Sequence, residues 1–167
     1  RVSNDFTVAI TRHVPTAKIV GCASRSDLAS AQLFASRHGI PKAYGSYKEL
    51  LEDEHVQVVY VGAVHAFRRE IVELCLLAQK HVLVEKPFAC TVKDAKYLID
   101  LAKAQNLFCM EGLWTCFFPA VTLARHLVLE EKIIGDVISV HSDFSIDATD
   151  NEGEKYPNSF LYNRDAG

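Results

Sequence analysis

Residues 78–87, Ala-Gln-Lys-His-Val-Leu-Val-Glu-Lys-Pro, decide the fold. They follow an apolar segment with helical spacing, and the central His-Val-Leu-Val is a short run that predicts a strand. Pro87 prevents this strand from continuing. Glu85 and Lys86 therefore fall at the carboxyl end of a strand, where open α/β sheets bind their ligands. The alternative interpretation is an ordinary surface ion pair that ends a buried strand.

Composition narrows the class of protein. The chain has 167 residues, of which 49% are hydrophobic and 23% charged, as expected for a globular protein with a sizeable core. A net charge of −3 argues against nucleic acid or an anionic membrane as partner. The apolar runs are too short to cross a bilayer. The five cysteines and seven histidines are dispersed, which predicts reduced thiols, a cytoplasmic protein and no metal site.

Helical and strand patterns alternate along the rest of the chain. This alternation predicts a Rossmann-like α/β fold, a doubly wound parallel sheet with right-handed crossovers. Its first strand and glycine-rich turn are expected before residue 1. We expect a dinucleotide-binding domain over residues 1–135 and the start of an α+β substrate and dimerisation domain over residues 136–167. The predicted helices are 3–13, 28–38, 68–79, 92–105 and 117–131, with a further short helix that follows Ser46 and includes Leu50 and Leu51. The predicted strands are 18–23, 56–63, 81–84, 107–110 and 137–144.

Local signals fix the ends of several helices. Asp27, Ser46 and Thr91 stand where a side-chain oxygen caps the first turn of a helix. Gly39 follows a helical pattern and favours its termination. Residues 146–167 are polar and without periodicity, which predicts a solvated loop.

Ser24 and Arg25 follow the first strand of the chain. In a dinucleotide-binding fold this position meets the adenosine ribose, where an acid bonds the 2′-hydroxyl and an arginine accommodates a 2′-phosphate. No acid stands at these two positions, and a guanidinium binds phosphate in a bidentate way. The pair therefore favours NADP over NAD, the alternative being an exposed loop arginine.

Three successive strands end next to residues that can carry chemistry. His65 follows the strand 56–63, and Glu85 with Lys86 ends the next strand. Trp114 follows the third, close to other aromatic residues that can wall a pocket. Each has an ordinary alternative, a solvated turn histidine or a core tryptophan, but their joint placement at one sheet edge favours a binding site.

Four motifs carry a resemblance to the glucose-fructose oxidoreductase and inositol dehydrogenase family of nicotinamide oxidoreductases. They are PKAYGSYKEL at 41–50, YVG at 60–62, KHVLVEKP at 80–87 and MEGLWTCFFP at 110–119. The resemblance implies that Lys86 lies by the nicotinamide and assists proton transfer, and that Arg25 selects NADP. It places Trp114 and Phe144 in the substrate pocket. The expected cofactor-binding residues are Ser24, Arg25, His65, Glu85 and Lys86.

The same resemblance implies an activity for the whole protein. It would be an NADP-dependent oxidoreductase acting on a CH–OH group of a cyclic trans-diol or an aldose, and a homodimer. The chain departs from the family at Arg68, usually histidine, and at Cys116, usually arginine. The family's catalytic tyrosine is expected after Gly167.

Two other interpretations stay open. One is a non-catalytic truncated remnant that binds nucleotide weakly or not at all. The other is a doubly wound domain for a different nucleotide, such as a methyltransferase, which an acid after the first strand would have favoured.

Overall fold

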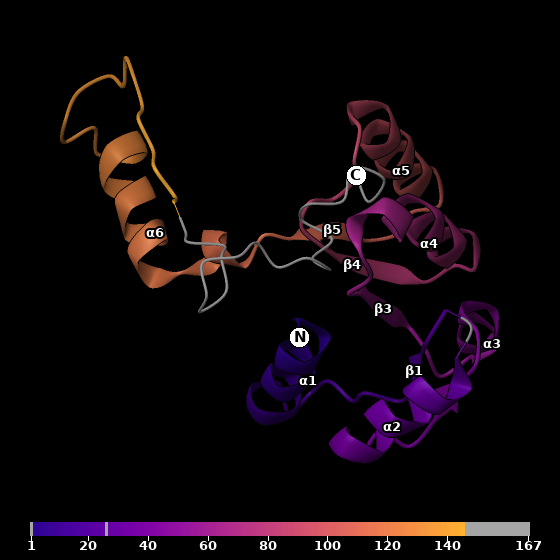
Figure 1. The fold of residues 1–167 in the computed structure, drawn as a ribbon. Coiled ribbons are helices and arrows are strands. Elements are labelled where there is room, and N and C mark those ends of the chain that lie inside the picture. Colours follow the sequence, from indigo (N-terminus) through magenta and orange to yellow (C-terminus); the bar gives the residue numbers. More distant parts are fainter. Residues whose placement is uncertain (1, 26, 146–167) are drawn as a thin grey trace, which may run out of the picture. The chain divides into compact units, whose positions relative to one another are not determined.

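The computed structural model describes residues 2–25 and 27–145. It divides into two compact units, Arg1–Gly112 and Leu113–Gly167. Figure 1 shows the order of the elements along the chain. In the described residues no helix is both long and apolar enough to cross a membrane.

The first unit contains two parallel sheets. One pairs β1 (Cys22–Ala23) with β2 (Ala43–Tyr44). The other has the order β3 (Val58–Val61), β4 (His81–Glu85), β5 (Cys109–Gly112). Parallel pairing of strands that alternate with helices confirms the predicted Rossmann-like α/β class.

The helices of the first unit are α1 (Val2–His13), α2 (Leu28–His38), α3 (Tyr47–Glu52), α4 (His65–Leu77) and α5 (Val92–Ala104). Of these, α2, α3 and α5 begin at predicted caps. Asp27 accepts a hydrogen bond from the Ser30 amide, and Gly39 closes the same helix in the left-handed conformation. Ser46 caps α3 and Thr91 caps α5 in the same way as Asp27 caps α2.

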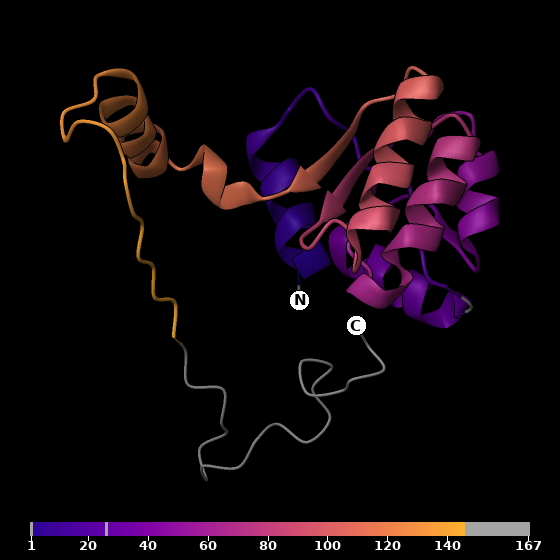
Figure 2. The same cartoon turned by 90° about the horizontal axis from the view of Figure 1, so that it is seen from above.

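Helices α4 and α5 lie side by side against the three-stranded sheet (Figure 2). Their apolar faces and the central strand β4 form the main core. Its fully buried members are Val72, Cys75, Leu76, Val82, Val84 and Leu98. Because β4 is paired on both sides, its carboxyl end is held between the ends of β3 and β5.

Several boundaries differ from those predicted. Strand β1 has only two residues instead of 18–23, because it pairs solely with the equally short β2 among the described residues. Helix α4 begins at His65 rather than Arg68, without a side-chain cap at Val64. The strand predicted over 56–63 narrows to β3.

The second unit is described by itself. It contains a 3₁₀ turn (Trp114–Phe117), α6 (Pro119–Arg125) and a π-helical turn (His126–Glu130) where one helix over 117–131 was predicted. The prediction of a strand over 137–144 is wrong, because no described segment pairs with it and its side chains are exposed. The domain boundary expected after residue 135 stays a prediction, and the loop 146–167 lies outside the described residues.

Candidate functional site

The site is centred on the turn that follows β4. Glu85 is the last residue of the strand and is only 8% exposed, and its Oε1 accepts a hydrogen bond of 3.0 Å from the Tyr60 hydroxyl. Lys86 is exposed, and the next peptide bond, to Pro87, is cis. In residues 2–25 and 27–145 the Lys86 ammonium has neither a hydrogen bond nor an ion pair. The Glu85–Lys86 ion pair of the alternative interpretation therefore does not form.

Tyr60 connects this turn to the first helix. Its ring stacks on Phe6 of α1, with the two centroids 3.6 Å apart and the planes 4° from parallel. Burial raises the pKa of Tyr60 well above its usual value, and the hydrogen bond to Glu85 is the second largest cause of this shift. The hydroxyl consequently remains a neutral donor to Glu85 across the physiological range.

Two further side chains hold the turn from either side. Arg68 of α4 is 6% exposed; its Nε donates to the Ala63 carbonyl and its Nη1 to the Pro87 carbonyl, each at 2.8 Å. From β5, Glu111 Oε1 accepts a hydrogen bond of 2.7 Å from the Phe88 amide. Sequence reasoning noted Arg68 only as a departure from a family pattern. The available signal was a charged residue on the apolar face of α4.

Ser24 and Arg25 lie just beyond β1, as predicted. The Ser24 amide donates to the Tyr44 carbonyl at 3.4 Å and continues the pairing with β2. The exposed Arg25 guanidinium carbon lies 4.3 Å from the ring centroid of Phe67. Since Phe67 and His65 share the first turn of α4, the structure brings the end of β1 to the start of that helix. The aromatic partner Phe67 was missed by the sequence analysis.

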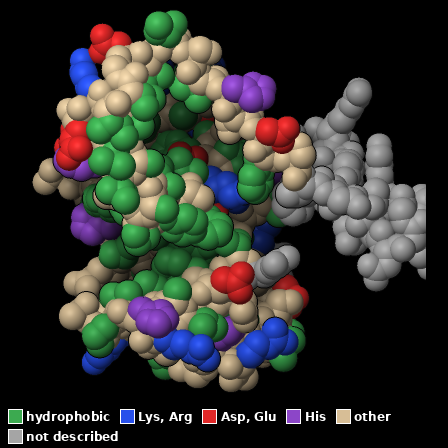
Figure 3. Space-filling model, turned by 90° about the vertical axis from the view of Figure 1, so that its left-hand side faces the viewer, with side chains coloured by type: hydrophobic (Ala, Val, Ile, Leu, Met, Phe, Trp, Pro, Cys, Tyr) green, Lys and Arg blue, Asp and Glu red, His purple; other side chains and the backbone are tan. Residues whose placement is uncertain are grey.

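The predicted pocket residues belong to the second unit. The Trp114 ring packs edge-on against Phe118, with centroids 5.5 Å apart. Phe144 is 91% exposed. Hydrophobic side chains are prominent on the face shown in Figure 3, and many of the exposed large ones belong to this unit. The role of Trp114 and Phe144 in a substrate pocket stays a prediction.

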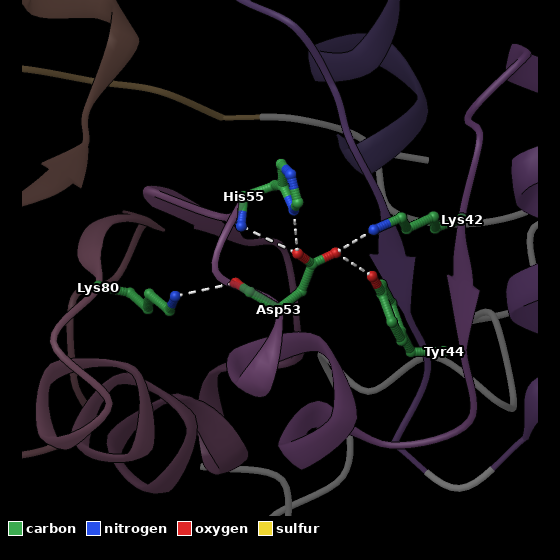
Figure 4. Close-up of polar contacts among 5 residues, drawn as sticks. All are labelled: Lys42, Tyr44, Asp53, His55 and Lys80. Carbon is green, nitrogen blue, oxygen red and sulfur yellow. Dashed lines mark hydrogen bonds and ion pairs between the residues drawn. The ribbon is translucent and has the colours of Figure 1, made fainter.

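A second polar cluster lies at the amino ends of the strands (Figure 4). Asp53 accepts hydrogen bonds from the Lys42 ammonium at 2.7 Å, from the Tyr44 hydroxyl and from the His55 amide at 2.9 Å. Lys80 donates to the Asp53 carbonyl at 3.0 Å. The Lys42 and Tyr44 hydrogen bonds hold the pKa of Asp53 well below its usual value. The hydrogen bonds of Asp53 join the loops that precede the strands. The cluster therefore lies at the edge of the sheet opposite to the turn that carries Lys86.

Comparisons with known proteins agree with the Rossmann-like fold. A family model described as "Oxidoreductase family, NAD-binding Rossmann fold" matches residues 1–113. Trans-1,2-dihydrobenzene-1,2-diol dehydrogenase of Xenopus tropicalis is 43% identical over 88% of this chain and 44% of its own length. The human protein of the same name is 41% identical over 86% of this chain and 42% of its own length. The chain thus spans less than half the length of these curated relatives.

Solved structures with the same fold include further oxidoreductases. A 3-ketoreductase from Actinomadura kijaniata, in complex with NADP, has a TM-score of 0.68 at 28% identity over 73% of this chain and 37% of that protein. Myo-inositol 2-dehydrogenase from Lactobacillus plantarum has a TM-score of 0.73 at 18% identity, over 83% and 40%. The resemblance drawn from the four motifs is confirmed. The chain belongs to the GFO/IDH/MocA family of oxidoreductases with an NAD-binding Rossmann fold.

Proposed function

We propose that the whole protein is an NADP-dependent dehydrogenase acting on a CH–OH group of a cyclic trans-diol or an aldose, of the dihydrodiol or D-xylose dehydrogenase type. One observation carries this proposal. The turn after β4 is bonded at Glu85, Pro87 and Phe88, while the ammonium of Lys86 is exposed and unpaired among the described residues. A cation held in this way at the carboxyl edge of a parallel sheet is suited to act on a ligand.

The residues present fit a nicotinamide dinucleotide. Bound NADP would supply the hydride acceptor for the carbinol hydrogen. Lys86 would donate a hydrogen bond to the substrate hydroxyl, lower its proton affinity and help to carry its proton away. The family resemblance implies that the direct acid–base group is a tyrosine.

Arg25 supports the preference for NADP. Its guanidinium is exposed beside Ser24, and no carboxylate stands at either position. Phe67 orders the guanidinium from one face, which leaves its N–H groups available to a phosphate. His65 and Glu85 complete the proposed cofactor-binding set. Trp114 and Phe144 are proposed to contact the substrate, and the whole protein is proposed to be a homodimer in the cytoplasm.

Substitution of Lys86 tests the proposed chemistry. In the full-length protein, Lys86→Met is expected to lower kcat for dihydrodiol or D-xylose oxidation by about 10²- to 10⁴-fold, with the Kd for NADP nearly unchanged. The matched control is Lys93→Met, an exposed lysine on the first turn of α5. Turnover of Lys86→Met within a few-fold of the control would refute the role of Lys86.

Substitution of Arg25 tests the cofactor. A charge-assisted hydrogen bond to phosphate contributes about 1.5–3 kcal/mol, so Arg25→Ala is expected to raise the Kd for NADP about 10- to 100-fold. The Kd for NAD should barely change. Equal losses for the two cofactors, or a preference of the unsubstituted protein for NAD, would contradict the proposal. Binding of neither cofactor would favour the non-catalytic remnant.

A further inference from the structure

The guanidinium of Arg68 is a buried charge that the proposed chemistry does not use. Arginine is almost never fully buried unless its donors are satisfied. Here the side chain lies on the inner face of α4, close to the core residues Ile71 and Val72. Burial lowers the pKa of Arg68, while Glu85 chiefly opposes this shift, so the guanidinium stays protonated.

The two acceptors of Arg68 belong to different loops. Ala63 follows β3, and Pro87 follows β4, so Nε and Nη1 of one rigid group join the carboxyl ends of two neighbouring strands. Lysine has a single nitrogen and cannot reproduce this planar two-point contact. The Pro87 carbonyl is the first beyond Lys86, so the guanidinium acts directly on the backbone that carries the lysine.

The other side of the turn is bound from β5. Glu111 holds the Phe88 amide, and Gly112 lets β5 approach closely: a Cβ on Gly112 would lie 3.3 Å from the Val84 carbonyl oxygen and 3.5 Å from Glu85 Oε1. Glu85 itself is bound by Tyr60 from β3. Fixed groups thus flank Lys86 on both sides along the backbone.

We propose that Arg68 is a positioning residue for Lys86, acting through the Pro87 carbonyl. The inference rests on the proposed function, because it assigns Lys86 to the chemistry. With Arg68 in place, the backbone that carries the Lys86 ammonium is already ordered before the substrate binds. A displacement of about 1 Å at a reacting group can lower a rate by about 10²-fold.

A double-mutant cycle in the full-length protein tests this inference. Arg68→Met is expected to lower kcat about 10²-fold with the Kd for NADP changed less than about threefold. In a Lys86→Met background the same substitution should lower kcat by less than about threefold, since the group it positions is already absent. The matched control is Arg69→Met, because Arg69 pairs at the surface with Glu73 and Asp94.

Hydrogen exchange supplies a readout independent of turnover. Exchange of the Phe88 amide should accelerate about tenfold in Arg68→Met and not in Arg69→Met. Arg68→Lys keeps the charge with one of the two contacts, so it should give a smaller change in both kcat and exchange. This variant serves where Arg68→Met does not fold.

Two results would overturn the inference: equal loss of kcat in both backgrounds, or unchanged exchange at Phe88. Failure of the proposed function gives a different result, because the single variant Lys86→Met would then turn over at an unimpaired rate. If Lys86→Met lowers kcat and the losses of kcat from Arg68→Met and Lys86→Met are additive, only the role of Arg68 is refuted.

Discussion

Removing the hydroxyl of Tyr60 isolates the contribution of its hydrogen bond to Glu85. Tyr60→Phe retains the ring that stacks on Phe6 and deletes the donor 3.0 Å from Glu85 Oε1. Because Glu85 is only 8% exposed, water cannot fully replace the lost donor. The bond is charge-assisted and buried, so we expect the free energy of unfolding to fall by about 2 kcal/mol.

This loss corresponds to a decrease of about 30-fold in the ratio of folded to unfolded protein. With a denaturant slope of about 2 kcal/mol per M, the urea midpoint should fall by about 1 M. Urea titrations followed by far-UV circular dichroism measure the shift.

The control is a second tyrosine–glutamate hydrogen bond in the same unit. Tyr97 of α5 donates to Glu73, but Tyr97 is exposed and Glu73 is only partly buried. Tyr97→Phe should therefore shift the urea midpoint much less than Tyr60→Phe does. Equal midpoints for Tyr60→Phe and Tyr97→Phe would refute the reasoning that burial gives the Glu85 bond its weight.

Two other predictions concern the polar cluster and the core. The pKa of Asp53 is lower in the folded protein than the unfolded value of about 3.9, so its stabilisation is complete above that pH and is lost as pH falls through the folded value. The difference in thermal midpoint between wild type and Asp53→Asn should therefore be largest near pH 7 and shrink below about pH 4; a constant difference would contradict it. Leu98→Ala, at a fully buried position, should lower the free energy of unfolding by about 2–5 kcal/mol. Ile99→Ala, at the exposed neighbouring position, should lower it by about 1 kcal/mol or less. Similar urea midpoints for the two variants would be evidence against the assigned core.

The parts of the fold that the sequence predicts best depend on neighbouring residues alone. Asp27, Ser46 and Thr91 each bond an amide three residues further on, and Gly39 needs only its own φ of +64°. Such rules are independent of tertiary contacts, which is why the helix ends they mark are confirmed. Glu85 and Lys86 were also placed correctly at a strand end.

Features that depend on distant partners were not predictable in the same way. The hydrogen bond from Arg68 to Pro87 spans 19 residues, and no local pattern indicates that α4 presents this side chain to the turn that carries Lys86. The alternation in 137–144 predicts a strand, but a strand forms only with a partner, and the described residues supply none.

The stacking of Arg25 on Phe67 has a consequence for the strength of the phosphate binding proposed for Arg25. A free arginine side chain samples many rotamers, and fixing such a chain on binding costs about 0.5–1.5 kcal/mol. Here the aromatic face of α4 restricts that motion in the folded chain, before any anion arrives. A phosphate bound by Arg25, as proposed, would therefore meet a side chain whose rotamer entropy was already lost during folding.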